Sequence, residues 1–118
     1  MKNKISLQEM SDLAQKIVQE RDWEKFHTLK NICINLTCEA AELLEIFTWM
    51  SEEECQNLSQ TKRQNLADEI GDVLFTLFLI CQKTNIDLSA AFLQKIEKIK
   101  DKYPVEKSRG RNAKYTEL

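Results

Sequence analysis

The chain has 118 residues, of which 42% are hydrophobic and 31% charged, and this size and composition are typical of one compact globular domain. Two glycines and one proline are too few for the turns of a β-sandwich or barrel, but they suit long helices. The net charge of −2, from 17 basic and 19 acidic residues, argues against a nucleic-acid polymer as partner. The longest apolar stretch, residues 73–81, is too short to cross a bilayer, so no membrane partner is expected.

The cellular location is predicted from the first residues and from the cysteines. The polar start, MKNKIS, lacks the apolar segment of a signal peptide. The four cysteines (Cys33, Cys38, Cys55 and Cys81) form no CxxC motif, and His27 is the only histidine, which argues against a structural zinc site. We therefore expect reduced core thiols in a cytoplasmic protein.

The predicted elements are all helical. Apolar residues at helical spacing predict helices over residues 6–20, 28–49, 59–83 and 88–103, with a loop over 21–27 and a short helical turn after Ser51. Capping boxes at Ser6 and Ser51 mark two of the starts, and Pro104 ends the last long helix. We predict an all-α catalytic domain over residues 1–104, followed by a polar, basic tail over residues 105–118.

Two of these helices carry carboxylates within their apolar stripes. On the second helix, Glu39 falls on the stripe formed by Leu36 and Leu43, where a side chain points toward the core. The third helix repeats this anomaly among its core-like leucines and isoleucines, and Gly71 there suggests close approach of another group. The carboxylates are spaced at i, i+3, and they are Glu39, Glu42 and Glu45 on the second helix and Glu69 and Asp72 on the third.

The second helix offers these carboxylates no basic partner. No lysine or arginine lies between Glu39 and Ser51, and the nearest on the third helix is Arg63, in its first turn. Like charges at i, i+3 repel one another, and a hard divalent cation turns that repulsion into ligation by oxygen atoms. The pattern therefore predicts a site for Mg²⁺, with Mn²⁺ as the alternative, held by Glu39, Glu42, Glu69 and Asp72.

The same residues carry a resemblance to a known family. The sequence EAAE at 39–42, followed after 26 residues by EIGD at 69–72, resembles the E-x-x-E…E-x-x-D signature of MazG-like all-α nucleoside triphosphate pyrophosphohydrolases. Further blocks, at 20–27, 47–49, 87–88, 103–104 and 114–118, are similar to the dCTP pyrophosphatase branch of that family. The resemblance covers nearly the whole chain. It implies a bundle of four to five helices that is completed by homo-oligomerisation, as a homodimer or homotetramer.

The resemblance also implies the reaction. Members of the family hydrolyse a nucleoside triphosphate between the α and β phosphates, which yields the monophosphate and pyrophosphate. The four predicted metal ligands would hold Mg²⁺ against the phosphates, and one of them or Glu45 would act as general base. The substrate expected from this branch is dCTP or a modified dCTP, and the expected role is sanitation of the nucleotide pool.

Substrate-binding residues are implied in the same way. Trp23 and Trp49 coincide with aromatic positions of the branch and would stack on the base. Candidates for holding the triphosphate are the basic residues near the end of the chain, namely Lys95, Lys98, Arg109, Arg111 and Lys114, and of these only Lys95 stands at a family-like lysine position. Ala14, Thr76 and Ile99 stand where the branch usually has a histidine, a tyrosine and an asparagine. These departures leave the choice of base open, and broader clearance of non-standard triphosphates stays an alternative.

Two hypotheses from other classes compete with this one. One is a helical interaction module whose acidic stretch binds a basic partner, and it predicts exposed carboxylates. The other is a module that binds nucleotides without hydrolysing them. The third helix favours self-association under any of these functions, since residues 73–81 are apolar on nearly every side.

Overall fold

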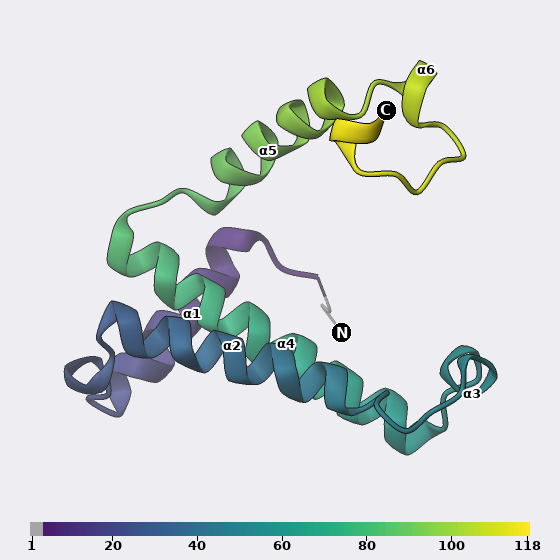
Figure 1. Ribbon diagram of the computed structural model, residues 1–118. Coiled ribbons are helices and arrows are strands. Elements are labelled where there is room, and N and C mark those ends of the chain that lie inside the picture. Colours follow the sequence, from purple (N-terminus) through teal and green to yellow (C-terminus); the bar gives the residue numbers. More distant parts are fainter. Residues whose placement is uncertain (1–3) are drawn as a thin grey trace. The chain divides into compact units, whose positions relative to one another are not determined.

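A computed structural model describes residues 4–118, and every regular element within that range is helical (Figure 1). The predicted all-α class is confirmed. The longer helices are α1 (Leu7–Glu20), α2 (Leu29–Glu45), α4 (Gln60–Thr84) and α5 (Leu88–Lys102). The shorter elements are α3 (Glu52–Gln56), α6 (Val105–Ser108) and two 3₁₀ turns, η1 (Glu24–Phe26) and η2 (Tyr115–Glu117).

Side-chain caps determine where the helices begin. The predicted capping boxes are present: the Ser6 hydroxyl accepts from the backbone N–H of Glu9, and the Glu9 carboxylate accepts from that of Ser6. Helix α4 ends at Thr84, and its C-cap Asn85 adopts the left-handed conformation with φ of 55°. The residues that cap N-termini through their side chains are Ser6, Thr28, Ser51, Ser59 and Asp87.

Helix α2 is shorter than its sequence pattern predicts. The prediction extended it to about Trp49, but it ends at Glu45. The backbone tightens there into i to i+3 hydrogen bonds, with the Phe47 N–H donating to the Leu44 carbonyl at 3.0 Å and the Thr48 N–H to the Glu45 carbonyl at 3.2 Å. The apolar stripe continues through this turn, so periodicity alone does not reveal the end of the helix.

The core lies where α2 packs against α4, and α1 adds a smaller contact with α4. Val18, Ile32 and Leu79 form its buried centre, and Phe75 and Ile80 pack around it. The two helices run antiparallel, as Figure 1 shows for the ribbons labelled α2 and α4. Residues 29–45 of α2 therefore meet residues 60–84 of α4 in reverse order, which determines which polar side chains face one another.

The chain separates into two compact units, residues 1–85 and residues 86–118. In the second unit the tail turns back on α5, where the Tyr103 and Tyr115 rings meet edge to face with centroids 6.1 Å apart. The Lys102 ammonium lies 4.7 Å from the centroid of the Tyr115 ring. The catalytic boundary at residue 104 is a functional division and stays a prediction. Among the described residues no single helix is long and apolar enough to cross a membrane.

The cysteines are not core residues, and that part of the prediction was wrong. All four are free thiols, with Cys33 and Cys38 exposed and Cys55 and Cys81 partly exposed. On α2, Cys33 follows the buried Ile32 by one residue and so points about 100° away from it around the helix.

We expect Ile32→Ala to lower the free energy of unfolding by about 2–4 kcal/mol, because Ile32 is only 4% exposed and its truncation leaves a cavity between α2 and α4. Leu44→Ala, on the same helix but at a position 66% exposed, is the matched control and should cost less than about 1 kcal/mol. Urea unfolding followed by circular dichroism measures both. Equal losses for the two variants would contradict the position of the core.

Candidate functional site

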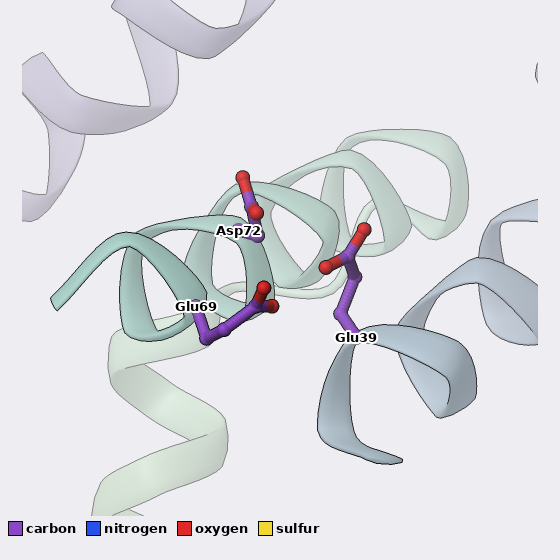
Figure 2. A group of neighbouring side chains, drawn as sticks. All are labelled: Glu39, Glu69 and Asp72. Carbon is purple, nitrogen blue, oxygen red and sulfur yellow. The ribbon is translucent and has the colours of Figure 1, made fainter. Parts of the chain in front are cut away.

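Three of the predicted metal ligands meet between α2 and α4. Figure 2 shows Glu39 of α2 facing Glu69 and Asp72 of α4. One carboxylate oxygen from each residue lies within 4.8 Å of the other two. Glu39 and Glu69 are half-buried, whereas Asp72 is exposed. The antiparallel packing brings these side chains together, since each helix alone supplies only an i, i+3 pair.

The fourth predicted ligand, Glu42, lies one turn further along α2 and is exposed. It lines a cavity of about 450 Å³ next to the cluster. Glu45 lines the same cavity, which places the predicted alternative base beside the cluster. Lys62, Asn65 and Asp68 complete its polar wall together with Glu69. The sequence pattern did not single out Lys62, Asn65 or Asp68.

The cluster has no internal counter-charge. The Oε2 atoms of Glu39 and Glu69 are buried and have no hydrogen-bond partner within residues 4–118. None of the ion pairs in that range includes Glu39, Glu42, Glu69 or Asp72. Burying an unpaired carboxylate is costly, and carboxylate oxygens are the donors that hard divalent cations prefer. The donor set therefore fits Mg²⁺ or Mn²⁺.

The surroundings of Glu39 favour its protonated form. Burial, together with the carboxyl groups of Glu69, Glu42 and Asp72 around it, raises the pKa of Glu39 from 4.5 to about 7. A raised pKa means that the ionised form is disfavoured in the folded protein without a cation. A cation near this carboxylate would favour the ionised form and lower that pKa again.

A second cavity, also of about 450 Å³, is lined by Cys38, next to Glu39 in the sequence, and by Phe75, one turn after Asp72, and it carries no ionised side chain if His27 is neutral. Trp23 forms one wall, with its ring centroid 6.5 Å from that of His27. The Arg21 guanidinium lies 5.6 Å from the Trp23 ring centroid. The remaining lining residues are Asn31, Ile32, Ile34, Asn35 and Leu79. We call this space the neutral cavity.

The sequence contains a signal for the neutral cavity in the spacing of two asparagines before Glu39. Asn35 precedes Glu39 by four residues and Asn31 precedes it by eight, so all three share one face of α2. Polar residues in line with a predicted ligand on a mostly apolar face are candidates for substrate contact.

The two tryptophans lie at opposite ends of α2. Trp23 precedes the helix and Trp49 follows it, and the 17 residues between their turns span about 25 Å. Trp49 is 93% exposed and does not line the neutral cavity. One base therefore cannot stack on both rings of a single chain.

The predicted phosphate-binding residues all belong to the second unit. Lys95 and Lys98 are exposed on α5, and Arg109, Arg111 and Lys114 are exposed in the tail. None of the five takes part in an ion pair of the described residues. Their role toward a triphosphate stays a prediction.

Two of the three departures from the family pattern are buried in the first unit. The Thr76 side chain is only 3% exposed, and its hydroxyl donates to the Val73 and Asp72 carbonyls, at 2.8 and 3.2 Å. Ala14 is buried as well, whereas Ile99 is exposed on α5. The Thr76 hydroxyl is therefore used by the helix itself and cannot replace a tyrosine as a contact to a base.

The chain is similar to known proteins in both sequence and fold. Residues 34–118 match the sequence profile of the MazG-like family. dCTP pyrophosphatase 1 from Bos taurus is 36% identical over 115 residues, which cover 96% of this chain and 68% of the relative. The Homo sapiens protein of the same name is 35% identical over the same shares. A crystal structure of a pyrophosphatase from Archaeoglobus fulgidus superimposes with a TM-score of 0.78 at 33% identity, covering 88% of this chain and 97% of that one.

The raised pKa of Glu39 gives the metal-free protein a defined pH dependence. Between the unfolded value near 4.5 and the folded value near 7, the folded state binds more protons than the unfolded state. Stability without metal should therefore fall as pH rises through this window. Thermal unfolding in a chelator, from pH 5 to pH 8, measures it. Glu39→Gln should flatten the decline, and an unchanged decline in that variant would contradict the assignment.

Proposed function

Since this chain belongs to the MazG-like family, we propose that it hydrolyses dCTP or a modified dCTP between the α and β phosphates, with Mg²⁺ as cofactor. Nucleotide pyrophosphatase activity follows from the family and from relatives that are named pyrophosphatases. The observation that supports the metal is the cluster of Glu39, Glu69 and Asp72, with two buried oxygens that lack any hydrogen-bond partner in the described range. Release of a monophosphate and pyrophosphate would serve nucleotide-pool sanitation in the cytoplasm.

We assign different chemical roles to the residues in and around the cluster. Glu39, Glu69 and Asp72 would hold the cation, with Glu42 as the further ligand one turn away. When bound, Mg²⁺ or Mn²⁺ supplies Lewis-acid stabilisation of the charge on the phosphates. Glu45 is exposed in the adjoining cavity, and we propose that it accepts the proton of the attacking water as general base. Lys95, Lys98 and the tail residues Arg109, Arg111 and Lys114 are proposed to contact the triphosphate.

The neutral cavity is proposed to bind the base. Its walls are apolar and aromatic with a few polar groups, which is the usual composition of a small-molecule site. Trp23 offers a flat face for stacking. Trp49 lies too far along α2 to join it within one chain, so we propose that Trp49 of a second copy completes the site.

A groove on α1 and α4 supports a homodimer or a homotetramer. Its volume is about 240 Å³, and no charged residue lines it. Leu13 and Ile17 of α1 remain exposed there, although they are large apolar residues. A Cβ atom added to Gly71, in the same groove, would meet nothing within 4 Å. Within residues 4–118 no atom beyond its two chain neighbours and the backbone of its own helix comes within 4 Å of that Cβ position, so a contact this close would have to come from a second copy.

The interaction-module hypothesis fits these observations less well. It requires carboxylates exposed to a basic partner, whereas Glu39 and Glu69 are half-buried against each other. A nucleotide-binding module without hydrolysis shares the same cavities and is distinguished only by product analysis.

The proposed function is tested by incubating the purified protein with Mg²⁺ and each of the eight common ribo- and deoxyribonucleoside triphosphates. Anion-exchange chromatography separates the monophosphate and pyrophosphate from the diphosphate and phosphate. We expect the monophosphate and pyrophosphate, with dCTP preferred. Binding of a nucleotide without any turnover, modified cytosine nucleotides included, would favour the non-hydrolytic module.

Glu42→Gln and Asp72→Asn should each abolish Mg²⁺-dependent turnover, because each removes a charged ligand oxygen. The stability of the metal-free protein should be unchanged or higher, since neutralising a crowded carboxylate relieves repulsion. Asp12→Asn is the matched control: Asp12 is exposed on α1 and lines none of these cavities. Activity that survives in both site variants would refute the metal assignment.

The proposed oligomer is tested by substituting a residue of the apolar groove. Leu13→Glu places a charge where a second copy would pack, so light scattering after gel filtration should show a monomer. Phe26→Glu changes a residue that is 64% exposed outside the groove and should leave the oligomer intact. An oligomer that persists in Leu13→Glu with unchanged stability would place the interface elsewhere.

A further inference from the structure

The two cavities beside the carboxylate cluster differ in charge. The cavity on the Glu42 side is lined by four carboxylates and the single ammonium of Lys62. The neutral cavity, on the side of Cys38 and Phe75, has no ionised lining residue when His27 is neutral. A nucleobase is uncharged and its faces are apolar, so transfer into the neutral cavity does not bring it against unpaired charges. The polyphosphate then extends toward the cluster.

Only a few groups in the neutral cavity can form directional hydrogen bonds with a base. Asn31 and Asn35 contribute carboxamides, and neither side chain has a hydrogen-bond partner within residues 4–118. Each carboxamide presents a donor and an acceptor side by side. At one edge of the cytosine ring the 4-amino group donates and N3 accepts, which complements the acceptor and donor of a carboxamide.

Position along the helix distinguishes the two asparagines. Asn35 lies four residues before Glu39, a rise of about 6 Å, while Asn31 lies eight residues before it, a rise of about 12 Å. In a nucleotide only the sugar and its 5′ carbon separate the base from the α phosphate. With the α phosphate at the carboxylate cluster, the base reaches the level of Asn35.

We infer that Asn35 is the residue that reads the 4-position of the bound pyrimidine. This inference rests on the proposed function, because it takes the α phosphate to lie at the cluster. The Asn35 carboxamide accepts a hydrogen bond from the 4-amino group through its oxygen and donates one to N3 through its nitrogen. Trp23 stacks on the ring and fixes its plane, so the amide meets only the edge.

The test pairs a change in the protein with a change in the substrate. Asn35→Leu removes both hydrogen-bonding atoms at similar volume, and the exposed helical position tolerates leucine well. The substrates are dCTP and the 2-pyrimidinone deoxyribonucleoside triphosphate, which lacks the 4-amino group. For the unmodified protein we expect kcat/KM to fall about 10- to 100-fold between them. For Asn35→Leu we expect less than about a threefold difference.

Thr37→Leu is the matched control, because Thr37 is exposed on the same helix and does not line the neutral cavity. It should discriminate between the two substrates as strongly as the unmodified protein. The inference would be overturned if the Asn35→Leu variant discriminated between the two substrates as strongly as the unmodified protein. It would also be overturned if the unmodified protein did not distinguish the two substrates.

A binding measurement separates this inference from the proposed reaction. The α,β-imido analogues of the same two nucleotides are not hydrolysed at the proposed bond, and titration calorimetry with Mg²⁺ gives their Kd values. If the natural nucleotides are not hydrolysed but the analogues still show discrimination that depends on Asn35, the proposed function fails and the reading of the base stands. Discrimination in binding that is independent of Asn35 overturns the inference whether or not hydrolysis occurs.

Discussion

The antiparallel contact between α2 and α4 is the constraint on which the rest of the first unit depends. Near one end of this contact Ile32 packs with Leu79 in the core. Two turns further along, the same register brings Glu39 to Glu69 and Asp72. A slip of one residue in this packing would rotate both sets of side chains by about 100° relative to the facing helix. Core and site therefore cannot be adjusted independently.

This shared interface has an electrostatic cost in the absence of a cation. Acidic side chains converge without a basic partner from the described residues, and burial raises the pKa of Glu39. A fold selected for stability alone would place apolar or paired residues at these positions. The chain keeps carboxylates there, which is the usual sign that stability is given up for a site with a function.

The cavities on the two sides of the α2–α4 interface also differ in charge. A neutral, partly aromatic cavity lies on one side of the carboxylates and a highly charged cavity on the other. The charged cavity is lined by four carboxylates and one lysine, so a chain of phosphates would lie there only with divalent cations between the like charges. If both tryptophans bind the base, as proposed, one chain supplies only part of the enclosure, because Trp23 and Trp49 lie at opposite ends of α2. The apolar groove on α1 and α4 offers a surface through which a second copy could supply the rest.

The sequence by itself determined the helices and the spacing of the carboxylates, because caps and periodicity act within a few residues of chain. It therefore predicted the all-α class, the starts of α1 and α4 and the i, i+3 pairs. It did not predict the end of α2 at Glu45, the exposure of Cys38 or the placement of Asn35 in a cavity. Tertiary structure decided these features, since they depend on which face of one helix meets another and at what register. Periodicity shows that a face is apolar, but only packing shows what lies opposite each residue.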